Sequence, residues 1–161
     1  MLLRPATTAD IPALIDLRIA LLKEVHPQAT PLSAPHSPLL PHSDIAAQLA
    51  HYYRAHLGHT YINWLAIDGD TIPSSAGICF YHFAPSFQSA NDMRAFILNV
   101  YTLPQYRRQG LARQLFAKLM LEATTRGITQ VSLHASPDGR DLYQQFGFTA
   151  RDNEMVWRAG M

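Results

Sequence analysis

The chain has a single cysteine, Cys79, among its 161 residues, so no disulfide can form within it. It has no stretch of eighteen consecutive apolar residues, which is the length that a membrane-spanning helix requires. Charged residues make up only 16% of the chain, and the formal net charge is +1, without a long block of either sign. These absences argue against a disulfide scaffold, a membrane protein and a nucleic-acid-binding protein, whose phosphate contacts usually need a basic patch.

The common motifs of nucleotide and metal sites are missing as well. The sequence contains neither Gly-x-x-x-x-Gly-Lys-Ser/Thr nor Gly-x-Gly-x-x-Gly. Eight histidines are present, but none has the His-Glu-x-x-His spacing of a zinc site, so no metal is expected. The N-terminus lacks a signal-peptide pattern because Arg4 and Asp10 interrupt it, which makes the cytoplasm the expected location.

Two kinds of apolar periodicity predict a globular domain of the α/β (α+β) class over residues 1–161. With 48% hydrophobic residues, a chain of this length can bury a sizeable core. Short apolar runs predict strands, and i, i+4 spacing predicts helices. The expected strands are Leu2–Arg4, Tyr61–Ile67, Ala76–Phe83, Ala95–Val100, Val131–His134 and a final hairpin of Phe148 with Met155–Arg158. The expected helices run from Thr7 or Asp10 to Val25, from Ser43 or Asp44 to Leu57, from Leu111 onward, and from Asp138 to Phe146.

Residues 27–42 are rich in proline and contain five of the eleven prolines, at positions 27, 31, 35, 38 and 41. A proline at every third or fourth position prevents both helix and sheet, so this segment is expected to be one long loop. Long loops in compact domains are usually functional or disordered. One interpretation of this segment is a surface insertion without a role.

Residues 98–113 are the most informative stretch, because a strand, a short loop and a helix follow one another there. Pro104 ends the strand, and helical spacing begins directly after Gly110. The first turn of a helix has unpaired N–H donors at the positive end of its dipole. Gly110 lets the backbone approach an anion, and Arg107 and Arg108 add positive charge. This combination predicts a binding site for a pyrophosphate group.

Within this stretch, Arg107-x-x-Gly110-x-Ala112 resembles the acetyl-coenzyme A signature of the GCN5-related N-acetyltransferase (GNAT) family, Gln/Arg-x-x-Gly-x-Gly/Ala. Downstream, residues 142–148, Leu-Tyr-Gln-Gln-Phe-Gly-Phe, resemble the family's Leu-Tyr-x-x-x-Gly-Phe. Residues 2–10 resemble its opening strand and helix, and residues 154–157 resemble its closing strand. The resemblance therefore spans most of the chain, in the order of the family.

The resemblance implies the GNAT fold, which is a mixed central sheet of about six to seven strands flanked by about four helices. Its fourth and fifth strands, here Ala95–Val100 and Val131–His134, are expected to be parallel and joined by a crossover helix. In the family these two strands splay apart at the cofactor site, and the pantetheine arm of the cofactor lies along the fourth strand. The family resemblance also places residues 27–42 at the border of the acceptor pocket, which makes them a candidate lid as an alternative to a surface insertion.

The resemblance further implies acetyl-coenzyme A (acetyl-CoA) as co-substrate. The residues expected to bind it are Asn99, Val100, Tyr101, Thr102, Arg107, Arg108, Gln109, Gly110, Leu111, Ala112, Arg113, Ser136, Gly139 and Tyr143. Ser136 stands where many relatives have a longer asparagine, and Gly139 stands where they often have alanine. For Arg107 an alternative stays open, in which its side chain braces the loop.

Tyr143 is the expected catalytic residue, because the tyrosine of the family at this position points toward the cofactor sulfur. A phenol with a pKa of about 10 can give a proton to a thiolate whose pKa is about 8.5. A backbone N–H near Val100 or Tyr101 is the expected donor to the oxyanion. The group that deprotonates the amine stays open between a water molecule and the following residues: Glu24, His82, Asp92, Tyr101 and His134.

The expected function is the transfer of acetyl from acetyl-CoA to a primary amine of a small molecule, a peptide or a protein. Two alternatives stay open, an acyl-CoA-binding sensor without turnover and an interaction module that works through the proline-rich loop. An acyl group other than acetyl also stays open. A homodimer is an expectation by analogy with the family alone.

Overall fold

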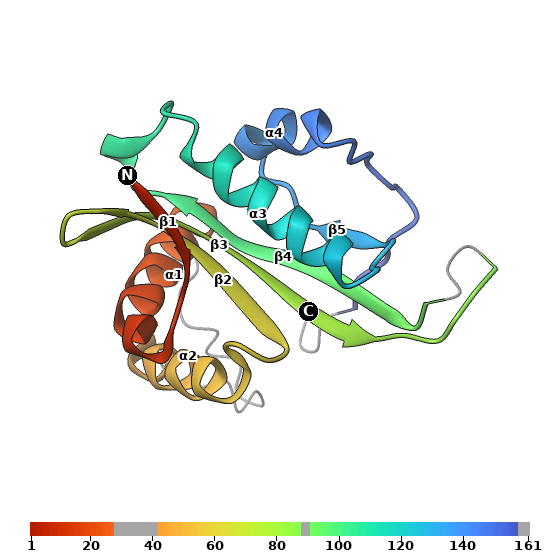
Figure 1. The fold of residues 1–161 in the computed structure, drawn as a ribbon, viewed down its shortest axis with the longest axis horizontal. Coiled ribbons are helices and arrows are strands. Elements are labelled where there is room, and N and C mark those ends of the chain that lie inside the picture. Colours follow the sequence, from red (N-terminus) through yellow and green to blue (C-terminus); the bar gives the residue numbers. More distant parts are fainter. Residues whose placement is uncertain (28–41, 88–90, 158–161) are drawn as a thin grey trace.

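The structure is a computed structural model that describes residues 1–27, 42–87 and 91–157, with the backbone alone at residues 42–44 (Figure 1). Its strands are β1 (Leu2–Pro5), β2 (Tyr61–Asp68), β3 (Thr71–His82), β4 (Met93–Thr102) and β5 (Val131–Leu133). Its helices are α1 (Ile11–Val25), α2 (His42–His56), α3 (Leu111–Thr125) and α4 (Arg140–Gln145), with 3-10 turns at Thr8–Asp10, Pro104–Tyr106 and Pro137–Gly139. The proline-rich loop of residues 27–42, and with it the lid interpretation, lies almost wholly outside the described residues.

The strands form one mixed sheet in the order β1-β2-β3-β4-β5. Neighbours are antiparallel from β1 to β4, whereas β4 and β5 are parallel and are connected by α3. Helices α1 and α2 cover one face of the sheet, and α3 and α4 cover the other (Figure 1). The predicted mixed sheet with a parallel β4–β5 pair is confirmed, although β5 lies at the edge of the described sheet.

The described strands are fewer than predicted, because the final hairpin is not formed. Phe148 and residues 150–157 have no strand structure, and Arg158 lies outside the described residues. The apolar side chains of this segment are instead exposed by 97%, 66% and 86% at Met155, Val156 and Trp157. An alternating apolar pattern does not by itself supply a partner strand, and β5 offers an edge of only 3 residues.

Strand β3 begins at Thr71, earlier than the predicted start at Ala76. Pro73 lies within it, which a regular ladder would not allow because proline has no N–H to donate. The register of β2 against β3 shifts at this place, between Ala66 and Asp68 on β2, so Pro73 occupies a bulge. The prediction therefore missed the first five residues of the strand, which precede the apolar run that begins at Ala76.

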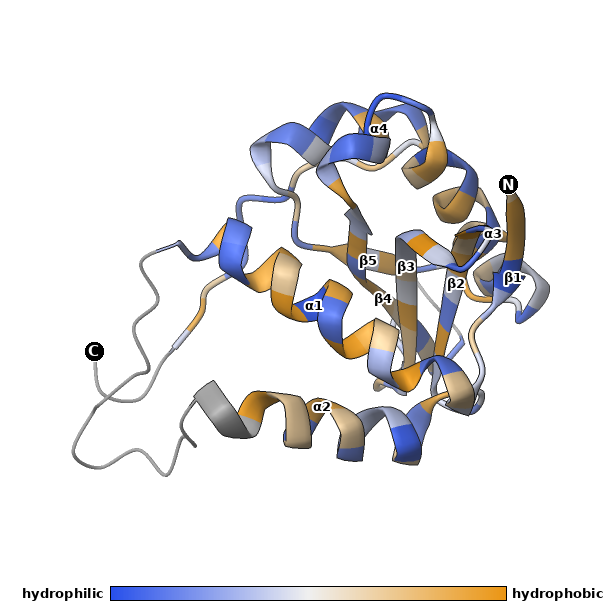
Figure 2. Cartoon of the chain, turned by 90° about the vertical axis from the view of Figure 1, so that its left-hand side faces the viewer, coloured by the Kyte–Doolittle hydropathy of each residue, from blue (hydrophilic) through white to orange (hydrophobic). Residues whose placement is uncertain are grey.

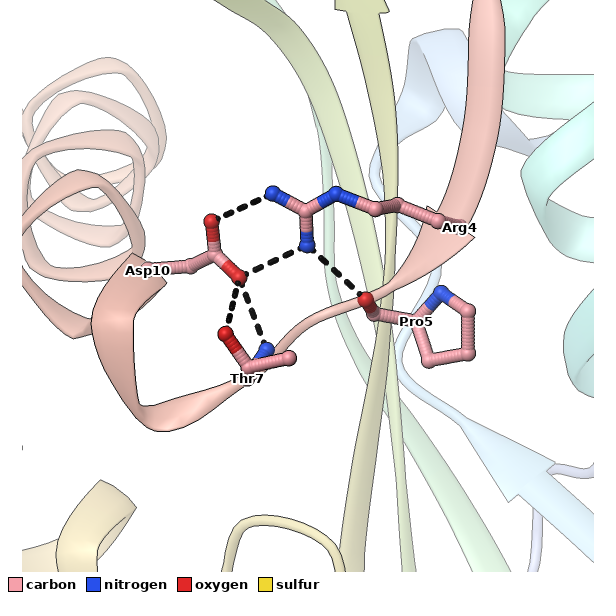
Figure 3. A network of polar contacts seen from close by, with 4 residues as sticks. All are labelled: Arg4, Pro5, Thr7 and Asp10. Atoms are coloured by element: carbon pink, nitrogen blue, oxygen red, sulfur yellow. Dashed lines mark hydrogen bonds and ion pairs between the residues drawn. The ribbon is translucent and has the colours of Figure 1, made fainter.

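An ion pair holds the entry into α1 (Figure 3). Arg4 Nη2 donates to Asp10 Oδ1 at 2.7 Å, and Arg4 Nη1 donates to Asp10 Oδ2 at 2.8 Å. The same Oδ2 accepts a hydrogen bond from the Thr7 backbone N–H at 2.7 Å. The hydrogen bond from Arg4 holds the pKa of the buried Asp10 carboxyl well below its usual range. Asp10 thus connects β1 to the first turn before α1, in the position that the sequence predicts for the helix start.

Two hydrophobic clusters lie on opposite faces of the sheet. Figure 2 shows apolar and polar residues alternating along α1 and α2, as in helices that bury one face. The cluster beneath α3, here called the α3-side core, includes Leu115, Phe116 and Leu119, all with no exposed surface. The cluster beneath α1 and α2, here called the α1-side core, includes Tyr53 and Tyr61. The hydroxyl groups of Tyr53 and Tyr61 are therefore buried beneath α1 and α2.

Candidate functional site

Strand β4 is paired with β5 along only part of its length, and the unpaired part defines the candidate site. Its pairing with β5 covers only Ala95–Ile97 against Val131–Leu133. Within the described part of the chain, the backbone of residues 98–102 has no strand partner on the β5 side. The predicted separation of β4 from β5 is confirmed, and it exposes a free strand edge just before the loop that leads into α3.

A bulge interrupts β4 at Asn99, whose φ of 59° lies in the left-handed region. On β3, Ala76 alone stands opposite both Asn99 and Val100, because the register shifts there. The alternation of side chains breaks as a result. Leu98 and Asn99 both face the α1-side core, whereas Val100 packs against the α3-side core. Tyr101 is thereby turned toward α1, where its hydroxyl finds a partner.

The side chain of Asn99 lies in a buried polar group that we call the Asn99 cluster, made of Tyr53, Tyr61, Asn63 and Asn99. Asn99 Nδ2 donates to the Tyr61 hydroxyl at 2.8 Å and to the Tyr53 hydroxyl at 3.2 Å. Asn63 Nδ2 donates to the Tyr61 hydroxyl at 2.7 Å. Burial raises the pKa of Tyr53 to about 12 and also raises the pKa of Tyr61, so both hydroxyls stay protonated at neutral pH.

The start of α3 is open to an anion. Gly110 is the N-cap residue with a φ of 76°, no side chain caps this end, and the first turn has no acidic residue. The N–H of Gln114 reaches the carbonyl of Gly110 at 3.1 Å, so the N–H groups of residues 111–113 have no intrahelical partner. A β-carbon built on Gly110 meets nothing within 4 Å, which leaves open space before these donors. A pyrophosphate group fits this arrangement of donors, dipole and space.

The other predicted cofactor contacts around Gly110 differ in their exposure. Arg108, Gln109 and Arg113 are exposed beside the helix start, whereas Leu111 is buried in the α3-side core. Ala112 is half-buried and adds little bulk next to the N–H donors. Arg108 has a φ of 62°, a left-handed conformation that costs about 1–2 kcal/mol for a residue other than glycine. The surrounding chain must therefore impose this loop shape.

Arg107 is engaged within the protein. Its Nη2 donates to both carboxylate oxygens of Glu24 at 2.7 Å, and its Nε donates to the Thr102 carbonyl at 3.0 Å. The Tyr101 hydroxyl donates to Glu24 Oε1 at 3.0 Å. Burial raises the pKa of Tyr101, and the neighbouring Glu24 raises it further. This geometry agrees with the bracing alternative for Arg107, since its guanidinium connects α1, the end of β4 and the loop before α3.

Tyr143 lies on α4 with its ring in the α3-side core. Its ring centroid lies 5.3 Å from that of Phe116 and 6.4 Å from that of Phe148. Burial raises the pKa of the Tyr143 hydroxyl. A β-carbon on Gly139 would lie 2.9 Å from Tyr143 Cε2 and 3.2 Å from Ser136 Oγ. The structure therefore brings Ser136, Gly139 and Tyr143 together, and the close packing explains glycine in place of alanine.

The residues proposed as the general base lie in different parts of the fold. Glu24 and Tyr101 meet at the free end of β4. His82 Nδ1 lies 3.0 Å from Asp92 Oδ2 in an exposed pair at the opposite end of that strand, roughly 20 Å from the bulge at a rise of about 3.3 Å per residue. His134 follows β5, and its Nε2 lies 3.5 Å from Glu154 Oε1. The distance along β4 argues against a direct role for the His82 pair in chemistry at the bulge.

Sequence reasoning did not identify the Asn99 cluster as a unit. It did not single out Tyr53, Tyr61 or Asn63. One signal was available, because Tyr61, Asn63 and Leu65 alternate on the inward face of a strand, and an amide at such a position requires a buried partner. The positive φ of Asn99 had no comparable signal beyond the tolerance of asparagine for the left-handed region.

Neither a membrane-spanning helix nor a metal site is found among the described residues. No helix there has the length and apolar character needed to cross a membrane. No three His, Cys, Asp or Glu side chains come together there in a way that could hold a metal ion.

The comparisons with known proteins agree with this geometry. Residues 87–160 match the family model described as an acetyltransferase (GNAT) domain. A predicted acetyltransferase with acetyl-CoA from Clostridium acetobutylicum shares 27% identity and a TM-score of 0.83, over 98% of this chain and 95% of that chain. A GCN5-related N-acetyltransferase from Ralstonia eutropha shares 24% identity and a TM-score of 0.81, over 99% of both chains. An aminoglycoside antibiotic 6'-N-acetyltransferase from Acinetobacter haemolyticus shares 16% identity and a TM-score of 0.68, over 100% of this chain and 99% of that chain.

The search among curated proteins gave no match. The family model and the solved structures nevertheless confirm the resemblance drawn from the motifs. The chain has the GNAT fold. The Clostridium structure contains acetyl-CoA.

Proposed function

We propose that residues 1–161 form one N-acetyltransferase domain, which transfers acetyl from acetyl-CoA to a primary amine by direct attack in a ternary complex. The observation that carries this proposal is the position of two features at one end of the sheet. The free edge of β4 at residues 98–102 leads directly into the open, uncapped start of α3 at Gly110. A ligand with a long polar arm and a diphosphate needs both features in this order.

The start of α3 would hold the diphosphate. The N–H groups of residues 111–113 and the helix dipole favour negative charge there. The exposed guanidinium groups of Arg108 and Arg113 lie beside these donors and would add charge-assisted hydrogen bonds. Arg107 would act indirectly in this arrangement, because its ion pair with Glu24 fixes the loop that carries these groups.

The free edge of β4 would hold the amide-containing arm and the reacting group. Acetyl-CoA supplies a thioester, whose acetyl carbon is open to attack by a neutral amine. The backbone of Asn99, Val100, Tyr101 and Thr102 has no strand partner on the β5 side. An N–H near Val100 or Tyr101 would donate to the carbonyl oxygen as negative charge develops on it, a contribution that is worth about 3–4 kcal/mol in other acyl-transfer enzymes.

Tyr143 would return a proton to the leaving sulfur. Its phenol is protonated at neutral pH because burial raises its pKa. Ser136 and Gly139 pack around its ring and would lie along the same arm. A basic group or a water molecule must take the proton of the amine, and Glu24 is a carboxylate that is hydrogen-bonded to Tyr101 at the end of β4.

Binding and turnover can be tested separately. Isothermal calorimetry should detect coenzyme A binding, and thiol release from acetyl-CoA should depend on an amine from a panel of small amines, peptides and lysine-containing proteins. Tight binding without turnover on any acceptor would favour a silent acyl-CoA-binding sensor. The cytoplasmic location, the homodimer and the choice of acceptor stay predictions of the sequence.

Gly110→Glu should lower coenzyme A affinity at least about 100-fold, which is about 2.7 kcal/mol, because a carboxylate would occupy the space for the diphosphate and repel it. The matched control is Gly127→Glu, which places the same residue at a φ of 68° near the other end of α3. This control bears the same backbone strain and should keep the affinity. Retained affinity in Gly110→Glu would refute the proposed diphosphate site.

A further inference from the structure

The bulge in β4 is held from the opposite face of the sheet. Asn99 is 6% exposed, and its side chain points away from the free edge, into the α1-side core. Its amide nitrogen binds two tyrosine hydroxyls, from α2 and from β2. Its backbone carbonyl oxygen accepts a hydrogen bond of 3.4 Å from the Ser75 hydroxyl on β3. Three elements, α2, β2 and β3, therefore contact the single residue at which the bulge of β4 lies.

The surroundings leave little freedom in this arrangement. Tyr61 has no exposed surface, and a β-carbon on Gly77 would overlap its hydroxyl, so the ring fits only because residue 77 is glycine. Tyr53 stacks on Tyr61 with ring centroids 5.6 Å apart. The amide oxygens of Asn63 and Asn99 are buried without a hydrogen-bond partner among the described residues. A buried polar atom without a hydrogen-bond partner costs free energy, so this cluster lowers the stability that an apolar core would give.

We propose that Asn99 is a positioning residue for acyl transfer: its amide, bound to Tyr61 and Tyr53, fixes the bulge that aims the N–H groups near Val100 at the reacting carbonyl. The inference rests on the proposed function and assigns to the Asn99 side chain an indirect role, since it touches neither the free edge nor the start of α3. A left-handed residue costs strain, and the strain is retained here because the cluster holds it.

Loss of the Asn99 amide should affect the reaction rate and the coenzyme A affinity differently. The diphosphate site at Gly110 lies beyond the bulge, and the Asn99 side chain contacts neither that site nor the free edge along which the arm would lie. Coenzyme A affinity should therefore depend on the Asn99 side chain far less than the reaction rate does. The reaction rate should depend on it, because a displacement of about 1 Å in a positioned group can cost about 100-fold in rate. A residue with a merely structural role would instead lower stability and leave kcat per folded molecule unchanged.

The test uses Asn99→Gly and Tyr61→Phe in the full chain. Asn99→Gly accepts a φ of 59° without strain and removes the amide, whereas Tyr61→Phe keeps Asn99 and removes the hydroxyl that it binds. Each variant should lower kcat at least about tenfold while the Kd for coenzyme A changes by less than about twofold. Tyr61→Phe carries the test by itself if Asn99→Gly fails to fold.

Tyr52→Phe is the matched control. Its ring lies edge-on to Tyr53 and Tyr61 at centroid distances of 5.7 Å, but the hydrogen bonds of Asn99 go to the other two hydroxyls. It should keep kcat. An unchanged kcat in folded Asn99→Gly or Tyr61→Phe overturns the inference, and so does a parallel loss of kcat and coenzyme A affinity. If the wild-type chain neither binds coenzyme A nor releases thiol, the proposed function fails and the inference fails with it.

Discussion

The two faces of the sheet are built differently. The α3-side core is apolar and is centred on Phe116, which contacts the rings of Tyr143, Phe146 and Phe148. The α1-side core contains the buried hydroxyls and amides of the Asn99 cluster, which bind one another across α2, β2 and β4. The α3 side depends on shape and hydrophobic burial, whereas the α1 side depends on directional bonds. The comparison indicates that the α3 side contributes most to stability, whereas the bulge of β4 at the candidate site is held from the α1 side.

Phe116→Ala gives the largest expected effect, because it empties the centre of the α3-side core. Phe116 has no exposed surface, and truncation of such a residue usually costs about 3–5 kcal/mol. The free energy of unfolding in urea measures it. The control is Leu121→Ala on the same helix, where the side chain is 60% exposed, and this change should cost less than about 0.5 kcal/mol. Equal losses in both variants would contradict the account of this face.

Tyr143→Phe should separate catalysis from packing on that same face. The ring stays in contact with Phe116 while the proton donor is lost, so kcat should fall about 100-fold and the Kd for coenzyme A should stay unchanged. The raised pKa keeps the phenol protonated above its ordinary pKa of about 10, so ionisation of Tyr143 should not lower the wild-type rate between pH 7 and about pH 9.5. The exposed Tyr81 offers a control in Tyr81→Phe. An unchanged kcat in Tyr143→Phe would exclude it as the acid.

Asp10→Asn gives the smallest effect and belongs to the edge of the α1 side. Replacing the carboxylate weakens the bonds from Arg4 and Thr7 and should cost about 1–2 kcal/mol at pH 7. Because the folded pKa of Asp10 is lowered, its contribution is present above the unfolded pKa of about 3.9 and is lost as the pH falls through the folded value. The difference in melting temperature between wild type and variant should therefore shrink below about pH 4.

Asp16→Asn on the same helix is the control for this pH dependence, since Asp16 is exposed. It should leave the melting temperature nearly unchanged at both pH values. A difference between wild type and Asp10→Asn that stayed constant down to pH 2 would show that the ion pair does not account for the effect.

Much of the fold could be predicted from the sequence because the signals were local. The start of α3 directly after Gly110 follows from helical spacing and a glycine, and the tight turn between β2 and β3 follows from Asp68-Gly69-Asp70. The final hairpin was wrong because strand pairing depends on a partner edge that no local pattern specifies. The β3 boundary was wrong because Pro73 lies in a bulge, and a bulge is a property of two strands.

The candidate site could be predicted only in part, for a similar reason. The donors around Gly110 follow from one contiguous segment, and the structure places them where the motif indicates. The contact between Glu24 and Arg107 joins residues 83 positions apart, and the Asn99 cluster joins α2, β2 and β4. No spacing rule reports such contacts, although Asn63 on an inward strand face signals that a buried partner must exist.

The extra residue in β4 limits which insertions and deletions this strand can accept. Because Asn99 and Val100 share one place opposite Ala76, deleting a single residue there would give a straighter and more regular sheet. That deletion would also rotate Tyr101 to the other side of the sheet and part its hydroxyl from Glu24. A deletion or insertion in this short segment should therefore disturb the candidate site more than any single substitution does. The sheet would become more regular, but the residues after the bulge would face the wrong side of it.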